Sequence, residues 1–343
     1  MNGTSRPPGG LLASGVLFLL APFVGEVLGA SLRLSYFVEP LRVSGILLFY
    51  GAGVVLIREV ARRLGLNWWG IALLGLAFAL IEEGLALQTI FNPVGMGGEA
   101  VFGRALGTNW FWVVVVCGYH LVWSVLIPIA VAEWLFPHRR RSAWLPVRGS
   151  VVLAVLFGIG TAVFTLISYL RSDYRLAPLP VAITLLLVLG SVWAATRCVD
   201  TPKDVPSDVT GAQSSPPHPA AVAWAGLAGG IAWFVLHIVV FTGSRMSFVV
   251  WTGIALALAA AAALLLARWT RSGWTPHHQL ALCFGTMLSV GLFGLLIVTS
   301  DDRPENLAFQ LVLLFALPIA YIYLKRTRRP EPSRLEAHDP EAV

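Results

Sequence analysis

Residues 69–90 read WGIALLGLAFALIEEGLALQTI, and their only charged side chains are the adjacent Glu82 and Glu83. As a helix, a run of this length extends about 33 Å, which is enough to cross the hydrocarbon core of a bilayer, about 30 Å thick. Lipid cannot hydrogen-bond an exposed backbone, and the run lacks the alternating pattern of a membrane barrel strand. The stretch therefore predicts a transmembrane helix that carries two carboxylates inside the membrane.

The rest of the chain has the composition of a membrane protein. Of its 343 residues, 57% are hydrophobic and 12% are charged, and the mean hydropathy is +0.76. Soluble domains carry about 25% charged residues, so the composition excludes a soluble enzyme. The net charge of +6 is spread over short loops rather than along one polar face, which argues against a nucleic-acid partner. Arginine outnumbers lysine 22 to 2, which is typical of a GC-rich bacterial genome.

Ten apolar runs in the chain are long enough to span a bilayer as helices. They predict an all-α fold, a polytopic integral membrane bundle of about ten transmembrane helices. The ten runs lie at residues 11–30, 43–61, 69–90, 110–134, 149–170, 178–197, 221–241, 248–268, 279–299 and 305–324.

The lysines and arginines in the loops predict the orientation of these spans. An even number of spans places both termini on one side, and that side carries 17 of these residues while the opposite side carries seven. Positive residues concentrate on the cytoplasmic side of a membrane. We therefore expect a multi-pass protein whose partner is the lipid bilayer of the cell membrane and whose two termini are cytoplasmic.

Two polar segments divide the chain. Residues 1–197 are expected to form a membrane bundle of about six helices that holds the polar intramembrane residues. Residues 198–220 contain five prolines, three aspartates and several serines and threonines, a composition that predicts a disordered cytoplasmic linker. Residues 221–325 are expected to form a second bundle of about four helices, and residues 326–343 a cytoplasmic tail.

Three titratable side chains in neighbouring spans are the candidate catalytic residues. Glu82 and Glu83 lie at or just outside the midplane of the third span, and His120 lies about 15 Å into the fourth. The loop 91–109 joins the two spans, so they are antiparallel neighbours and a carboxylate can reach the imidazole. An ionisable residue at this depth costs several kcal/mol unless it is paired or hydrated, which makes it a functional candidate.

Four further residues are candidates for lining a cavity around these three. A glutamate in the first span and a histidine in the seventh fall at a similar outer depth. A serine lies four residues after His120, on the same helix face, and a tyrosine directly precedes that histidine. These residues are Glu26, His237, Ser124 and Tyr119.

Arg58 and Glu59 are a charged pair near the cytoplasmic end of the second span. Glu59 and Arg63 have the i,i+4 spacing of a helical ion pair, and long side chains can reach the interface from this depth. We expect these residues to be solvated and to help set the orientation of the span in the membrane, without a catalytic role.

The sequence contains no cofactor or metal motif. Cys117, Cys198 and Cys283 are isolated, and there is no HExxH, Walker A or GxGxxG pattern. We therefore expect no cofactor, no metal, and an unidentified small-molecule or peptide substrate. The loop 91–109 is rich in glycine without phosphate-loop spacing, and we expect it to form a lid or re-entrant turn over the polar cluster.

The string IEEGL at residues 81–85, followed by a histidine in the next span, resembles the CPBP group of CAAX-processing and bacteriocin-processing membrane proteases, also called Abi proteins. In that family a glutamate pair written EExxxR and histidines on later helices hold a water for peptide-bond hydrolysis. The resemblance implies that Glu82 and Glu83 match the pair and that His120 matches the first histidine. The family's arginine falls on Leu87, the aromatic residue before the first histidine falls on Val116, and the later histidine would be His237.

Three functions fit these residues. In an intramembrane hydrolase, Glu82 or Glu83 deprotonates a water while His120 orients it or stabilises the oxyanion. In a proton-coupled carrier, the carboxylates take up and release a proton during transport. In a non-catalytic membrane subunit, the same groups form a hydrogen bond that ties two helices together.

Overall fold

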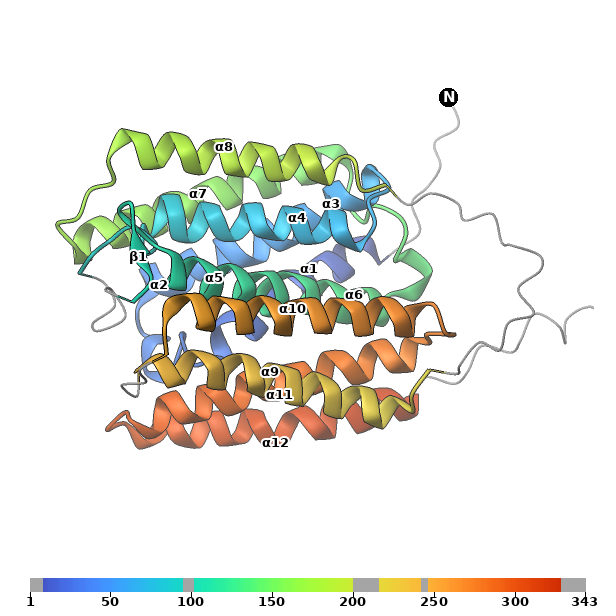
Figure 1. The fold of residues 1–343 in the computed structure, drawn as a ribbon. Helices are drawn as coiled ribbons and strands as arrows, with labels where there is room; N and C mark the ends of the chain where they lie inside the picture. Colours follow the sequence, from blue (N-terminus) through green and yellow to red (C-terminus); the bar gives the residue numbers. More distant parts are fainter. Residues whose placement is uncertain (1–8, 95–101, 200–215, 242–245, 328–343) are drawn as a thin grey trace, which may run out of the picture.

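The computed structural model of the chain is a bundle of membrane-spanning helices that run roughly parallel or antiparallel to one another (Figure 1). The structure describes residues 9–94, 102–199, 216–241 and 246–327. Within these residues it contains ten helices long and apolar enough to cross a membrane, which confirms the predicted fold class. The spans are Gly10–Val27, Pro40–Arg63, Trp68–Ala86, Trp110–Leu135, Val147–Arg171, Pro178–Ala195, Pro219–Val240, Phe248–Thr270, Pro276–Thr299 and Pro304–Thr327.

Each of the first four spans contains a π-helical segment, so each is built from more than one element. The α-helices are α1 (Gly10–Pro22), α2 (Pro40–Ile46), α3 (Gly53–Arg63), α4 (Trp68–Ala79), α5 (Trp110–Tyr119), α6 (Ile127–Leu135), α7 (Val147–Arg171), α8 (Pro178–Ala195), α9 (Pro219–Phe241), α10 (Phe248–Thr270), α11 (Pro276–Thr299) and α12 (Pro304–Thr327). The π-helical segments are η1 (Phe23–Val27), η3 (Leu47–Ala52), η4 (Leu80–Ala86) and η6 (His120–Leu126), and two short 3₁₀ helices are η2 (Leu34–Tyr36) and η7 (Pro137–Arg139).

The first four spans form the interior of the bundle together with α11. Half or more of each of these spans is buried, whereas α7, α8, α10 and α12 are only 11–17% buried and expose leucine, isoleucine and valine side chains, as lipid-facing helices do. In Figure 1, α8 and α12 lie at opposite edges of the bundle. The polar residues of the first four spans are therefore shielded from lipid by outer helices.

The helices after the predicted linker pack directly on those before it. One apolar core joins Val24 and Trp123 from the first group to Phe234 and Phe284 from the second. The Gln310 amide donates to backbone carbonyls of both groups, at 2.8 Å and 2.9 Å. The two groups of helices thus share buried surface. Of the predicted linker (198–220) and the predicted tail (326–343), residues 200–215 and 328–343 lie outside the described residues.

A loop contact also joins the two groups at one end of the bundle. Arg33 pairs with Asp301 at 2.9 Å, and the Asn306 amide donates to the same carboxylate at 2.7 Å. The hydrogen bond from Asn306 and the nearby Arg33 hold the pKa of Asp301 below its usual range. This carboxylate therefore stays ionised at neutral pH and keeps the loop contact in place.

The described part of the glycine-rich loop that was expected to form a lid lies at the same end of the bundle. Its described portion contains a short antiparallel hairpin of β1 (Arg104–Ala105) and β2 (Thr108–Asn109). The Arg104 guanidinium donates to the carbonyls of Phe91 and Asn92 at 3.1 Å and 2.9 Å. The hairpin is thereby tied to the end of the third span, while residues 95–101 lie outside the described residues.

Arg58 and Glu59 are not solvated, and this expectation was wrong. Both side chains are 0% exposed. Arg58 donates to Glu59 at 3.0 Å and to Glu133 at 3.1 Å, and its guanidinium lies 3.6 Å from the centre of the Trp144 ring. The reason is that the chain after α6 folds back over the helix ends and covers them. We call this region the arginine end; it comprises Arg58, Glu59, Arg62, Arg63, Glu133 and residues 139–145.

The arginine end is saturated with hydrogen bonds. The two oxygens of Glu59 accept from the backbone N–H groups of Trp144 and Leu145 at 2.8 Å and 3.0 Å. Arg62 holds Glu133 with two bonds of 2.7 Å. A buried ion pair of this kind stabilises only while every partner is present, because a charge left alone in the interior is not compensated.

The substitution Glu59→Gln is expected to destabilise the protein by about 3–5 kcal/mol, since it removes one charge from a buried network. The measurement is the thermal midpoint of the detergent-solubilised chain. Glu39→Gln is the matched control, because the Glu39 side chain is 40% exposed, and it should change stability by no more than about 0.5 kcal/mol. Equal midpoints for the two variants would contradict a stabilising role for the arginine end.

Candidate functional site

Glu82, Glu83 and His120 meet in the interior of the bundle. His120 Nε2 lies 3.1 Å from Glu83 Oε1, and His120 Nδ1 lies 3.6 Å from Glu82 Oε2. The three residues are 2%, 7% and 4% exposed, respectively. The third and fourth spans therefore make the carboxylate–imidazole contact that their depths suggested, and the imidazole lies between two carboxylates.

With Glu83 ionised, its oxygens only accept, so the imidazole nitrogen beside it is the donor, and His120 Nδ1 is left with a lone pair when the ring is neutral. Ser124, one turn further along the helix, places its Oγ 3.0 Å from that Nδ1 and donates to it. The second oxygen of Glu83 accepts a hydrogen bond from the hydroxyl of Thr89. Glu83 thus fixes both the tautomer and the orientation of the ring.

Tyr50, from the second span, is a member of the site that the sequence analysis missed. Its hydroxyl donates to Glu82 Oε1 at 2.5 Å and lies 3.5 Å from His120 Nδ1. The side chain is 1% exposed. An aromatic residue in an apolar span is usual, so nothing in the local pattern separates this tyrosine from a packing residue.

Glu26 joins the same cluster from the first span. Its carboxylate, that of Glu82 and the imidazole of His120 can each offer one atom such that the three atoms lie within 4.8 Å of one another. Glu26 is 9% exposed. The sequence placed this glutamate at the correct depth but assigned it only to a cavity wall, because helix rotation cannot be obtained from depth alone. These three residues are also the ones whose donor atoms suit a metal ion.

Every helix that contributes to the cluster does so from a π-helical segment. Glu26 lies in η1, Tyr50 in η3, both Glu82 and Glu83 in η4, and His120 at the start of η6. A π-helical turn widens the helix and changes the direction of the side chains that follow, and such turns occur frequently at functional sites.

The sequence gives local reasons for two of these turns. Pro22 has no backbone N–H and precedes η1 directly; after it, the N–H of Leu28 donates to the carbonyl of Phe23, five residues earlier, at 2.9 Å. Pro128 follows η6 by two residues, near the start of α6. In η3 and η4 no proline is present, and glycines Gly51 and Gly84 allow close approach of neighbouring helices.

One oxygen of the cluster has no hydrogen-bond partner among the described residues. It is Oε2 of Glu82, the oxygen that faces His120 Nδ1. Leaving a buried carboxylate oxygen unpaired is costly in a low-dielectric interior. The cluster therefore differs from the arginine end, whose carboxylates are saturated, because Oε2 of Glu82 can still accept a hydrogen bond or bind one more group.

Tyr119, one of the residues expected near the cavity, closes the side of the cluster. Its hydroxyl donates to the backbone carbonyl of Gly25, next to Glu26. Its ring stacks on Trp123, with a centroid separation of 5.5 Å. Tyr119 therefore positions η1 rather than contacting the carboxylates.

His237 lies apart from the other candidates, and its placement with them is corrected. Its Nδ1 contacts the carbonyl of Trp233 at 2.5 Å, and its ring packs against Phe111 and Trp251 at 5.9 Å and 5.5 Å. The depth of the residue in the seventh span was similar, but its ring packs among the aromatic side chains of Phe111, Trp233 and Trp251 instead of meeting the carboxylates.

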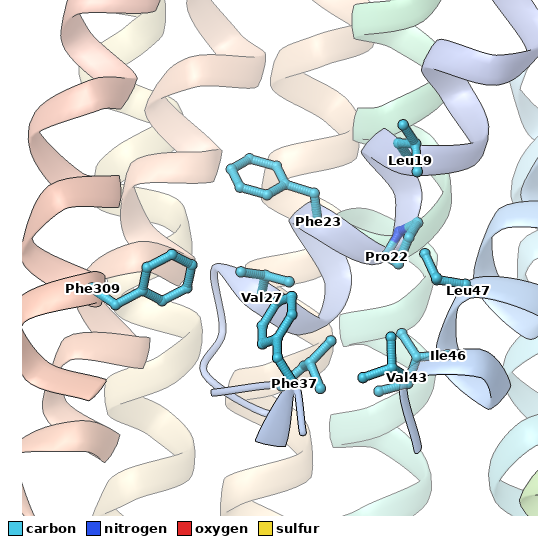
Figure 2. Close-up of a pocket in the computed structure, with 10 residues that line it drawn as sticks. Leu19, Pro22, Phe23, Val27, Phe37, Val43, Ile46, Leu47 and Phe309 are labelled. Atoms are coloured by element: carbon cyan, nitrogen blue, oxygen red, sulfur yellow. The ribbon is translucent and has the colours of Figure 1, made fainter. Parts of the chain in front are cut away.

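Two hollows are described near the outer half of the bundle, and the cluster residues line neither of them. One of the hollows is lined in part by the charged residues Glu39, Arg42 and Arg171. The other is a groove of about 230 Å³ beside η1. Figure 2 shows its side chains converging from the first span, from α2 and from Phe309 of α12. Phe23 and Val27 line the groove, and Glu26 is carried inward by the same π-helical turn. We call this hollow the outer groove.

Comparison with known proteins finds a family model that matches the chain. The model of an uncharacterized membrane protein family matches residues 16–333. No curated protein and no solved structure matches the chain. The family match overturns the resemblance to the CPBP proteases, which rested on two glutamates and one histidine, whereas the matching family model covers nearly the entire chain.

A methyl group at position 25 is expected to disturb the cluster. A Cβ on Gly25 would lie 2.7 Å from Ser124 Oγ and 3.2 Å from a ring carbon of Tyr50. Gly25→Ala should therefore cost about 1–3 kcal/mol, as overpacking of a core does. Its matched control is Gly15→Ala, in the same span, where no neighbouring atom lies within 4 Å of the new Cβ. Thermal midpoints in detergent measure both, and a Gly25→Ala midpoint at or above that of the control would contradict the close packing.

Proposed function

The chain belongs to this uncharacterized membrane protein family, and we propose that it is a membrane-embedded hydrolase whose centre is formed by Glu82, Glu83 and His120. The observation that carries the proposal is the unpaired Oε2 of Glu82, which lies 3.6 Å from His120 Nδ1. A base with a free lone pair beside an oriented imidazole is the arrangement that general acid–base catalysis requires.

The proposed reaction is the hydrolysis of an ester or amide. Oε2 of Glu82 takes a proton from a water, and the water oxygen attacks the carbonyl carbon. The bond to the leaving group then breaks, and the leaving group takes up the proton held by the glutamate. The hydroxyl of Tyr50 donates to Oε1 of this carboxylate, and once the glutamate is protonated it can turn from that oxygen to donate to the oxyanion.

The surroundings of the cluster support a substrate dissolved in the membrane. The outer groove lies on the other side of η1 from the carboxylates and is lined by apolar residues such as Phe23 and Val27. The arginine end, in contrast, is closed by buried ion pairs. An apolar hollow beside η1 and a closed arginine end together favour an acyl chain or an apolar peptide segment as the bound part of the substrate.

The hydrolase is tested with the purified chain reconstituted in lipid vesicles. The probes are a long-chain acyl ester of a fluorescent alcohol and a quenched fluorescent peptide that spans the bilayer. The wild type should cleave one of them, and Glu82→Gln and His120→Ala should each lower kcat by about 10²–10⁴-fold, which is the usual contribution of general acid–base catalysis. Glu39→Gln should retain the wild-type rate. Cleavage of neither probe, or full activity in both site variants, would refute the hydrolase.

A proton-coupled carrier is the second candidate, and the number of buried acids favours it. Three carboxylates lie beside a single imidazole, and they cannot all remain charged in the membrane interior without a compensating cation or proton. The same vesicles, loaded with a pH-sensitive dye, distinguish the two. Proton movement that depends on Glu82, without cleavage of either probe, would favour the carrier.

The orientation of the chain in the membrane is also a proposal. Since 17 of the 24 lysines and arginines lie on the side of the two termini, we infer that this side, with the arginine end, is cytoplasmic. A fluorescent protein fused after residue 343 should fluoresce in a bacterial host, and alkaline phosphatase at the same position should be inactive. The opposite pair of results would reverse the orientation.

A further inference from the structure

The cluster has the bonding pattern of a metal centre. Three side chains from three different spans, Glu26, Glu82 and His120, offer one donor atom each within 4.8 Å of one another. We infer that these three residues bind a divalent transition-metal ion, for which Zn²⁺ is the reference. Two carboxylate oxygens and one imidazole nitrogen are donors that this ion accepts in catalytic sites, which use three protein ligands and keep one open position.

The spacing of the donor atoms fits a bound ion better than a direct bond. Oε2 of Glu82 and Nδ1 of His120 lie 3.6 Å apart. This distance is too long for a good hydrogen bond. In a tetrahedral zinc site with bonds of about 2.0–2.1 Å, two ligand atoms lie about 3.3 Å apart, so a small adjustment brings both into coordination.

An outer carboxylate holds the histidine in the form that a metal requires. Glu83 accepts from Nε2 of His120 at 3.1 Å and is itself held by the Thr89 hydroxyl. A metal-binding histidine almost always donates its other N–H to a carboxylate or a carbonyl in this way, which directs the free nitrogen at the ion. This arrangement is independent of the three ligands and points to the same position.

The unpaired oxygen and the negative charge of the site also favour a bound metal ion. Tyr50 occupies Oε1 of Glu82, while Oε2 has no hydrogen-bond partner within the described part of the chain, although the residue is 98% buried. A dication would neutralise the two ligand carboxylates, Glu26 and Glu82, while the charge of Glu83 would be left to its bonds from His120 and Thr89. A metal ion would therefore give the unpaired oxygen a partner and lower the uncompensated charge in the low-dielectric interior.

Ser124 occupies the histidine lone pair and competes with the ion. Its hydroxyl lies 3.0 Å from Nδ1 of His120 and must turn away when a metal binds. The serine is therefore a neighbour of the site without being a ligand. Removing its hydroxyl leaves all three ligands in place and frees the nitrogen.

The inference deepens the proposed hydrolase and rests on it for the catalytic use of the ion, whereas binding is measured without any substrate. In the hydrolase, Glu26, Glu82 and His120 would hold the ion, and the ion would supply an open position at which the pKa of a water is lowered. Glu82 would then act as a ligand instead of as the base.

The experiment measures Zn²⁺ binding to the full chain, purified in detergent and stripped with a chelator. Equilibrium dialysis followed by elemental analysis should give one ion per chain for the wild type. Glu26→Gln, Glu82→Gln and His120→Ala should each weaken binding at least 100-fold. Glu83→Gln should weaken it about 10–100-fold, as loss of an outer carboxylate does, while Ser124→Ala and the distant control Glu39→Gln should bind at least as tightly as the wild type.

Co²⁺ provides a second readout that does not depend on the ligand variants folding. Bound in place of Zn²⁺, it should give the intense visible absorption of a four- or five-coordinate ion in the wild type and in Ser124→Ala. A wild-type chain that binds less than a tenth of an equivalent, or unchanged binding in both Glu82→Gln and His120→Ala, would overturn the site. Hydrolysis that persists in excess chelator would overturn the metal while leaving the proposed hydrolase intact, and metal binding without hydrolysis would do the reverse.

Discussion

The compensation of buried carboxylates is the constraint on which the interior of this bundle depends. Five glutamates, Glu26, Glu59, Glu82, Glu83 and Glu133, are at most 9% exposed within helices that cross the membrane. Each would cost several kcal/mol if left unpaired in a low-dielectric interior. The bundle compensates them in two layers, at the arginine end and in the cluster, and these layers differ in how completely they are satisfied.

The difference between the layers separates a structural role from a chemical one. At the arginine end, guanidinium groups and backbone N–H groups occupy the carboxylates of Glu59 and Glu133. In the cluster, the carboxylates are faced by a tyrosine, a threonine and one imidazole, and an oxygen of Glu82 lacks a hydrogen-bond partner in the described chain. Unequal saturation of otherwise similar buried acids is thus the physical basis for assigning function to the cluster alone.

The candidate site was only partly predictable from the sequence. Glu82, Glu83 and His120 were found because an ionisable residue in an apolar span stands out, and depth along the chain brought them to the same level. Depth failed for His237, which faces Trp233, Phe111 and Trp251, and it gave no signal for Tyr50. Glu133 lies inside the apolar run 110–134, so its burial could have been predicted from the sequence. Only the structure shows that it pairs with Arg58 and Arg62.

The sequence by itself determined the number, position and helical nature of the ten spans, because length and apolarity are local properties that lipid imposes directly on each segment. The rotation of each helix is not local. The four π-helical turns and the packing of glycines such as Gly25 against neighbouring side chains set that rotation. Only the tertiary structure therefore decided that Glu26, Tyr50, Glu82, Glu83 and His120 share one buried space, since convergence of side chains from four helices depends on contacts among all of them.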